Sequence, residues 1–225
     1  MSFHVSETSQ KVRGIISSNP EWQKHLDHSV YEKLGRDPLE PLLFSGNPKA
    51  GLAILGRDPG KDEIKLQTPL IGAAGKTLRK GLFEYFVGGE PKDIADYRKV
   101  EDHVFFVNTV PYKPKGNLPW AKSLQDALAP EISKLLVEYW RGDVLFCLGT
   151  QAWNWFSLNM MKEPVAVAST EELFSKEFSV ALTRPGAQGK SQKQIRVFVL
   201  PHPSPLNIRW KKRFPEILKS RLKEI

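Results

Sequence analysis

Three polar side chains follow apolar runs of the sequence, and their types suit the cleavage of a bond between a sugar and a nucleobase. They are Asp58, Asn108 and His202. Such cleavage builds positive charge on the sugar, which a carboxylate stabilises while it orients a water molecule, and negative charge on the departing base, which an imidazole N–H stabilises. An asparagine amide carries donors and an acceptor, so it can read the edge of a flipped pyrimidine. Each residue alone also fits a turn, a cap or a structural histidine, so the prediction depends on all three meeting in one cleft.

Four short apolar runs, rich in branched and aromatic residues, predict the strands that place these side chains. They are residues 52–55, 104–107, 144–148 and 195–200. The first three are nearly continuous, as in strands covered on both faces. Because helical spacing fills the gaps, we predict an α/β fold: a three-layer α/β/α sandwich with a central four-stranded parallel sheet, formed by residues 1–225 as a single domain. Ligands of such sheets bind outside the carboxyl ends of the strands, where the three polar residues stand.

Apolar positions at helical spacing predict the helices. Two stripes consist of Leu78, Leu82, Phe83 and Phe86 and of Leu128, Ile132, Leu135, Leu136 and Tyr139. Near the N-terminus, Asn19 and the proline after it begin a helix that Gly35 ends, and Pro215 opens a C-terminal helix. Residues 61–69 and 183–194 lack periodicity, so we expect loops there; the second loop is either disordered or in contact with a ligand.

The bulk properties favour a polyanionic partner. The 225 residues carry a formal net charge of +8, which suggests nucleic acid first and an anionic membrane second, although a protein can also be basic without such a partner. Cys147 is the only cysteine, which excludes an internal disulfide and a multi-cysteine metal site, and its apolar run predicts a buried, inert thiol. No stretch approaches the ~20 apolar residues that cross a bilayer, and we find no signal peptide. We therefore expect a soluble, intracellular monomer, cytoplasmic or nucleoid-associated, without membrane, metal or cofactor.

Four short motifs, in order along most of the chain from about Gly51 to Leu206, resemble those of the uracil-DNA glycosylase superfamily. They are Gly56-Arg57-Asp58-Pro59-Gly60, similar to the water-activating motif; Pro69-Leu70-Ile71-Gly72-Ala73-Ala74-Gly75, similar to a stretch of the iron–sulfur branch; Asn108 at the end of its apolar run; and His202-Pro203-Ser204-Pro205-Leu206. The resemblance implies an enzyme that flips uracil or a modified pyrimidine out of DNA and hydrolyses its N-glycosidic bond, leaving an abasic site. We expect a monofunctional glycosylase, because no lysine lies in a motif that marks a Schiff-base nucleophile.

The resemblance also implies roles for the matching residues. Asp58 would position the attacking water or stabilise the oxocarbenium ion, His202 would donate to the pyrimidine O2, and Asn108 would bind the base edge. The base pocket would include three further residues, Gly56, Gly60 and Leu70. Leu206 would fill the space that the base vacates. Close approach to phosphates would involve Ser204, Gly72 and Gly75.

The chain departs from the family pattern at three points. The iron–sulfur branch has four cysteines, so the single cysteine here excludes its cluster. Gly60 stands where the highly active branch has a tyrosine that rejects thymine, and Leu70 stands where the family has a phenylalanine that stacks on the base. These changes suggest a roomier pocket. Two alternatives therefore stay open: a glycosylase for C5-modified cytosines of foreign (phage) DNA, and a catalytically silent module that binds modified DNA.

Basic residues near the motifs are candidate DNA contacts. Lys76, Lys113 and Arg209 are expected to bind phosphates. The loop of residues 111–120 either contacts DNA or serves as a connector with Trp120 in the core.

Two further patterns carry weaker signals. Residues 72–77 end like a phosphate-binding loop, but position 70 lacks the required glycine and no strand directly precedes the segment. His25 and His28 have no matching cluster of metal ligands, so we expect a surface pair.

Overall fold

The computed structural model describes residues 4–161, 167–183, 192–204 and 207–225. Its strands are β1 (Phe44–Gly46), β2 (Leu52–Gly56), β3 (Val104–Asn108), β4 (Val144–Leu148), β5 (Glu177–Thr183) and β6 (Gln192–Leu200). They form one sheet in the order β1-β3-β2-β4-β6-β5. The inner strands β3, β2, β4 and β6 are parallel, which confirms the predicted four-stranded parallel sheet, while β1 and β5 add antiparallel edges that we did not predict.

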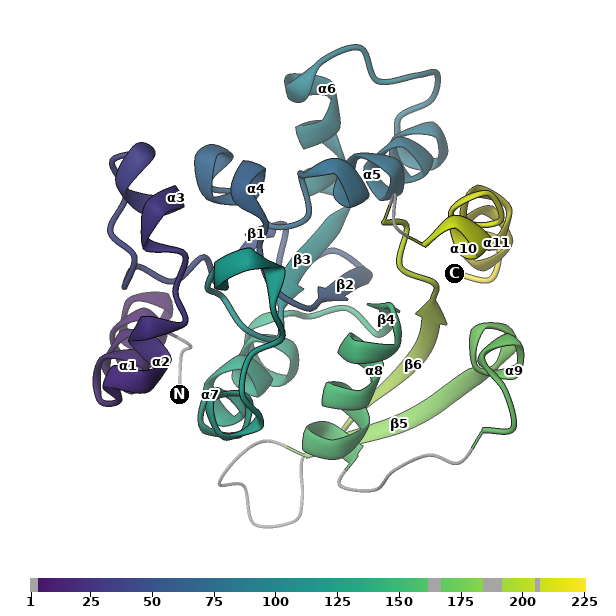
Figure 1. Cartoon of the computed structure of the whole chain (residues 1–225). Helices are drawn as coiled ribbons and strands as arrows, with labels where there is room; N and C mark the ends of the chain where they lie inside the picture. The colour runs from purple at the N-terminus through teal and green to yellow at the C-terminus, as the bar shows by residue number, and fades with distance from the viewer. Residues whose placement is uncertain (1–3, 162–166, 184–191, 205–206) are drawn as a thin grey trace.

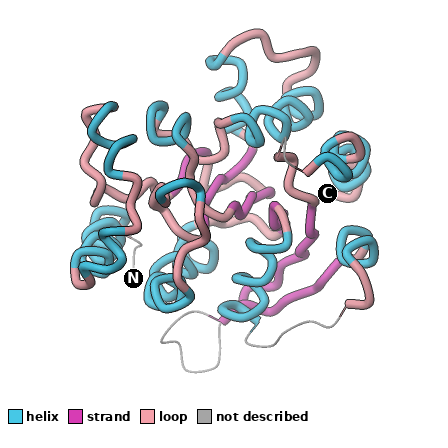
Figure 2. The backbone as a smooth tube through the Cα atoms, in the orientation of Figure 1, coloured by secondary structure: helices cyan, strands magenta, loops and turns pink. Residues whose placement is uncertain are grey.

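Helices cover both faces of this sheet (Figure 1). They are α1 (Val5–Ser17), α2 (Pro20–Lys24), α3 (His28–Lys33), α4 (Lys61–Leu66), α5 (Ala73–Phe86), α6 (Ile94–Lys99), α7 (Lys122–Lys134), α8 (Thr150–Phe156), α9 (Thr170–Ser175), α10 (Ile208–Lys211) and α11 (Phe214–Leu222). The tube view shows the strands in the middle with helices on either side (Figure 2). The predicted three-layer α/β/α sandwich is therefore confirmed.

Alternation along each inner strand divides the core into two apolar layers. In β2, Ala53 and Leu55 pack in a cluster with residues of α1, α7 and α8. Leu52 and Ile54 pack in a second cluster with residues of α5 and α11. All four side chains are at most 2% exposed, so the strand is buried on both faces, as its continuous apolar sequence predicted.

The helices predicted from apolar stripes are present. The stripe of residues 78–86 lies on α5, and the stripe of residues 128–139 lies on α7 and the π-helical turn Leu135–Tyr139 that follows it. Pro215 lies in the first turn of α11. The expected loop of residues 61–69 is wrong in part, because its first residues form α4.

The single N-terminal helix that we predicted is wrong, because the chain breaks it into α2 and α3. Asn19 caps α2 as expected, its Oδ1 accepting from the Glu21 N–H at 2.9 Å. The break falls at Leu26, which forms a bridge with Pro114, and at Asp27, whose N–H donates to the Lys113 carbonyl at 3.1 Å. Hydrogen bonds to a distant loop thus override the local helical pattern.

Candidate active site

The carboxyl ends of the parallel strands surround a cavity of about 500 Å³. Its walls are formed by Arg57, Asp58, Gly60, Glu63, Leu70, Gly72, Ala73, Ala74, Asn117, Leu148, Gly149, Thr150, Gln151, His202 and Ser204. We call it the base cavity. Six of the predicted site residues therefore line one space: Asp58, Gly60, Leu70, Gly72, His202 and Ser204.

Asp58 presents a buried carboxylate to this cavity. It follows β2 by two residues, and its side chain is only 7% exposed. Burial raises the pKa of Asp58 to about 6, although the nearby charges of Arg57, Lys113 and His25 act in the opposite direction. The carboxyl group is therefore mostly ionised at neutral pH. A carboxylate with so little contact with bulk water is suited to hold one water molecule or to stabilise a cation beside it.

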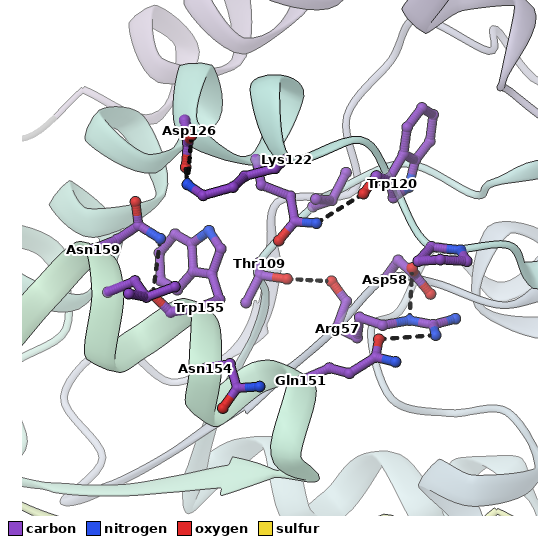
Figure 3. Close-up of a pocket in the computed structure, with 14 residues that line it drawn as sticks. Arg57, Asp58, Thr109, Trp120, Lys122, Asp126, Gln151, Asn154, Trp155 and Asn159 are labelled. Atoms are coloured by element: carbon purple, nitrogen blue, oxygen red, sulfur yellow. Dashed lines mark hydrogen bonds and ion pairs between the residues drawn. The ribbon is translucent and has the colours of Figure 1, made fainter. Parts of the chain in front are cut away.

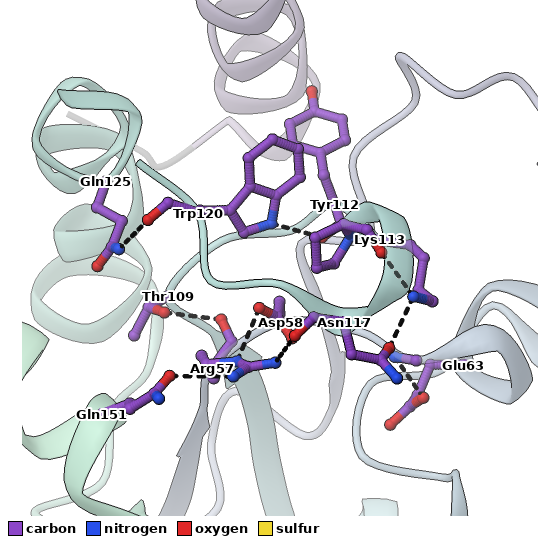
Figure 4. Close-up of polar contacts among 12 residues, drawn as sticks. Arg57, Asp58, Glu63, Thr109, Tyr112, Lys113, Asn117, Trp120, Gln125 and Gln151 are labelled. Carbon is purple, nitrogen blue, oxygen red and sulfur yellow. Dashed lines mark hydrogen bonds and ion pairs between the residues drawn. The ribbon is translucent and has the colours of Figure 1, made fainter. Parts of the chain in front are cut away.

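Arg57 clamps this carboxylate from one side, a role that the sequence did not suggest. Its Nε lies 2.8 Å from Asp58 Oδ2. Its Nη1 donates to Gln151 Oε1 at 3.1 Å, and its Nη2 donates to the Asn117 carbonyl at 3.2 Å. Figure 4 shows the guanidinium among these partners. Because the Thr109 hydroxyl also donates to the Arg57 carbonyl at 2.7 Å, both backbone and side chain of Arg57 are fixed.

His202 presents a neutral imidazole to the same cavity. Burial, together with the positive charge of Arg57, lowers the pKa of His202 to about 4. The ring is therefore uncharged at neutral pH and can donate one N–H. Gly149, in the loop after β4, has a φ of +89°, and a Cβ at this position would lie 3.0 Å from His202 Cβ. A glycine there permits both the backbone conformation and the close approach of the histidine.

Asn108 lies behind the cavity wall. Its side chain is fully buried, and neither Oδ1 nor Nδ2 has a hydrogen-bond partner among the described residues. A Cβ on Gly56 would lie 2.3 Å from Asn108 Oδ1 and 3.0 Å from Leu70 Cδ2, so these three residues meet at one point. Buried amides without partners are rare in proteins, and a ligand that reaches this position would supply the missing hydrogen bonds.

The sequence as a whole matches a known family. The family model of the uracil DNA glycosylase superfamily matches residues 44–225, which is most of the chain and includes every residue of the base cavity. The chain belongs to the uracil-DNA glycosylase superfamily. A comparison with curated proteins found no significant match. Membership in this family indicates a DNA glycosylase in general terms, with DNA as the partner.

Leu70 of this glycosylase has a left-handed backbone conformation, and hydrogen bonds from a buried arginine stabilise it. Leu70 has a φ of +53°. The Arg79 side chain, which is fully buried, donates from Nε to the Leu70 carbonyl at 2.7 Å and from Nη2 to the Pro69 carbonyl at 2.9 Å. A Cβ on Gly75 would lie 2.1 Å from the Leu70 carbonyl oxygen. Gly75 therefore allows α5 to approach Leu70, and its expected approach to phosphate stays a prediction.

The space beside Gly60 is occupied by a carboxylate. The Gly60 N–H donates to Glu63 Oε2 at 2.6 Å, and a Cβ on Gly60 would lie 2.5 Å from the same oxygen. A Cβ on Gly72 would lie 2.9 Å from it. Burial raises the pKa of Glu63, while hydrogen bonds from the backbone oppose this shift. The sequence suggested extra room in the pocket at Gly60, but the Glu63 side chain occupies this space and forms a polar wall there. The capping-box spacing of Gly60 and Glu63 was the signal in the sequence.

The expected DNA contacts have different outcomes. Lys76 is half-buried, and Arg209 is exposed and forms an ion pair with Glu171. Lys113 is 4% exposed, and its ammonium group donates to Asn117 Oδ1 at 2.7 Å and lies 3.4 Å from Asp27 Oδ2. This corrects the expected phosphate contact of Lys113, because internal partners hold its charge beside a residue that lines the base cavity. Leu206 lies outside the described residues.

Burial decides one alternative that the sequence left open and corrects one expectation. Trp120 is 5% exposed and its Nε1 donates to the Tyr112 carbonyl at 3.2 Å, so it belongs to the core. The histidines do not form the expected surface pair: His28 is exposed, whereas His25 is half-buried with its ring 4.8 Å from that of Trp120.

Further features concern the phosphate-loop pattern, metal ligands, membrane spans and Cys147. The segment of residues 72–77 follows α4 rather than a strand. Within the described residues, no three side chains gather as metal ligands, and no helix is long and apolar enough to cross a membrane. Cys147 is fully buried, which raises the pKa of its thiol.

Proposed function

We propose that this chain is a monofunctional DNA glycosylase that flips uracil or a modified pyrimidine out of DNA and hydrolyses its N-glycosidic bond. The observation that carries the proposal is the presence of a buried carboxylate, Asp58, and a half-buried neutral imidazole, His202, in the walls of one cavity at the carboxyl edge of the sheet. Ligands bind at this edge in parallel sheets.

Asp58 acts on the sugar side of the bond. Its carboxylate accepts a hydrogen bond from a water molecule and aligns it with the anomeric carbon, and its negative charge stabilises the oxocarbenium ion that forms there. As the water oxygen bonds to this carbon, the carboxylate takes the proton that the water loses. The pKa of about 6 keeps Asp58 in the required ionised form at neutral pH.

His202 acts on the base side. The electron pair of the breaking bond passes to the pyrimidine, where much of the charge resides on O2. A neutral imidazole N–H can donate a hydrogen bond to this oxygen and stabilise the leaving anion. Arg57 strengthens this effect, because its guanidinium adds positive potential near both His202 and Asp58.

Asn108 reads the edge of the base in this proposal. Its unpaired amide offers a donor and an acceptor, which match the N3–H and O4 of uracil. Because Leu70 packs at the same point, the base must contact or displace its methyl groups to reach the amide. Leucine gives no aromatic stacking, so this pocket depends more on hydrogen bonds.

A C5-modified cytosine is the second candidate substrate, and Glu63 is the observation that favours it. A carboxylate in the cavity wall can accept from the exocyclic amino group of cytosine, which uracil lacks. This carboxylate fills the space beside Gly60, so the polar group and not an open wall is what favours the cytosine.

Identification of the released base tests both candidates. Oligonucleotides with uracil, a thymine mismatch or C5-substituted cytosines are incubated with the protein, and released bases are measured by mass spectrometry. We expect release of uracil, of a C5-substituted cytosine, or of both. Asp58→Asn should lower turnover by about 100-fold or more with DNA affinity within a few-fold of wild type. The matched control Asp102→Asn, at an exposed position, should leave both unchanged. Absence of any released base would refute the proposed glycosylase activity and favour a catalytically silent module that binds modified DNA.

A further inference from the structure

A second cavity, of about 260 Å³ (Figure 3), shares Arg57 with the base cavity. Arg57, Asp58 and Gln151 line both spaces, so these side chains form a shared wall. The remaining walls come from the segment of residues 109–126 and from α8 with the turn that follows it. We call this space the amide cavity, because four side-chain amides line it: Gln125, Gln151, Asn154 and Asn159.

The amide cavity is suited to an uncharged ring with both donors and acceptors. Gln125 donates from Nε2 to the Trp120 carbonyl at 2.9 Å, so its own oxygen is the group left to accept. Gln151 Oε1 accepts from Arg57, so its amide nitrogen is the group left to donate. At the rim, Lys122 and Asp126 form an ion pair at 2.7 Å and neutralise each other.

A buried donor in this cavity lacks a partner. Trp155 is 3% exposed and lines the cavity, and its Nε1 has no hydrogen-bond partner among the described residues. Figure 3 shows the indole nitrogen on the side of the ring toward Thr109. Leaving a buried N–H unpaired is unfavourable, so a ligand with an acceptor such as a carbonyl oxygen would complete the site.

We propose that the amide cavity binds the base of the nucleotide adjoining the flipped one on the same DNA strand. This inference rests on the proposed function, because a nucleotide in the base cavity is what brings its neighbour to the shared wall. A nucleobase has the required uncharged ring with donors and acceptors along its edge. Every DNA substrate supplies one at this position, so no separate ligand is needed. Thymine, cytosine and guanine carry a carbonyl for Trp155 Nε1, whereas adenine does not.

Equilibrium binding tests the proposal without turnover. Single-stranded oligonucleotides carry 2′-fluoro-deoxyuridine, whose glycosidic bond resists hydrolysis, with thymine, cytosine, guanine, adenine or a stable abasic residue on its 5′ or 3′ side. Fluorescence anisotropy gives each Kd. On one side only, we expect the abasic neighbour to weaken binding about tenfold, in the range of a stacked and hydrogen-bonded base, and adenine to bind about fivefold more weakly than the other three.

Trp155→Phe removes the N–H but keeps a ring, so it should abolish the discrimination against adenine. The matched control Trp22→Phe makes the same change in a half-buried tryptophan outside the cavity and should keep the discrimination. Asn154→Ala, at an exposed position in the cavity wall, is a second variant that does not disturb the core and should reduce the effect of the neighbour.

Two results would overturn the proposal. One is binding that does not depend on the neighbour on either side; the other is a neighbour preference that persists in both cavity variants. A parallel assay of base release separates this inference from the proposed function. If uracil or a modified cytosine is released while the neighbour has no effect, the glycosylase stands and the second site is refuted. If no base is released while the neighbour effect depends on Trp155, the second site is supported and the proposed glycosylase activity is refuted.

Discussion

Replacement of Arg57 by glutamine should move the pH dependence of base release toward higher pH. Asp58 acts in its ionised form, so activity falls as the pH drops through its pKa, which is about 6 in the presence of Arg57. A positive charge next to a carboxyl group lowers its pKa by about 1–3 units, so the Arg57→Gln variant should have an Asp58 pKa of roughly 7–9.

The size of the effect follows from the ionised fraction. At pH 7 a group with a pKa of about 6 is roughly 90% ionised, and one with a pKa of roughly 7–9 is about 50% to 1% ionised. We therefore expect activity at pH 7 to fall about 2- to 100-fold and to recover much of this loss by about pH 9.5. The assay is the single-turnover rate of base release between pH 5 and 10.

Arg57→Lys is the matched control, because it keeps the positive charge and should keep the acid limb near its wild-type position. Removal of Arg57 also raises the pKa of His202, but from about 4, so Asp58 still sets the acid limb. An unchanged acid limb in Arg57→Gln would refute the electrostatic role of Arg57. An equal shift in Arg57→Lys would assign the effect to lost geometry instead of lost charge.

Three further predictions concern stability and fine geometry. Asp58→Asn should raise the free energy of unfolding at pH 7 by about 1–3 kcal/mol. The pKa of Asp58 is raised from 3.8 to about 6, which means that the folded state disfavours the charged form of this group. Urea unfolding should therefore show the gain above pH 6 and no gain below pH 4. Arg79→Met should lower the free energy of unfolding by about 3 kcal/mol or more, since two buried carbonyls lose their donor; a loss below about 1 kcal/mol would contradict this. Gly149→Ala and Gly88→Ala both place a side chain at positive φ and should each lower the free energy of unfolding by about 1–3 kcal/mol. Only Gly149→Ala should reduce base release, because only at this position does the new Cβ meet His202. Equal activity in the two variants would contradict the packing argument.

The inner strands and the layers were predictable because their signal is local. A strand buried on both faces has to be apolar throughout, and three runs showed this directly. β1 has only three half-buried residues and gives little signal. The sequence of β5 does carry a strand signal, because Phe178, Val180 and Leu182 alternate with exposed residues, although this strand was not among those predicted. The break between α2 and α3 depends on pairing with residues about 90 positions away, which no local pattern contains.

The site was predictable only in its outline. Topology placed Asp58 and His202 in one cavity, because parallel strands end at the same edge of the sheet. The partners that hold the site were not predicted, since their roles come from burial. Arg79 reads as a surface residue of a helix, yet it is fully buried against two carbonyls. Lys113 reads as a DNA contact, yet its charge is used inside the protein.

The charge of Arg57 explains how two buried groups reach complementary protonation states at the same pH. Burial alone pushes each group toward its neutral form, which suits His202 as a neutral donor but opposes ionisation of Asp58. A guanidinium between them lowers both pKa values, so it restores the carboxylate without charging the imidazole. A cation at this position therefore helps both halves of the proposed reaction. The same side chain also forms the wall between the base cavity and the amide cavity, so a ligand on either side that displaces it would change the charge state of Asp58.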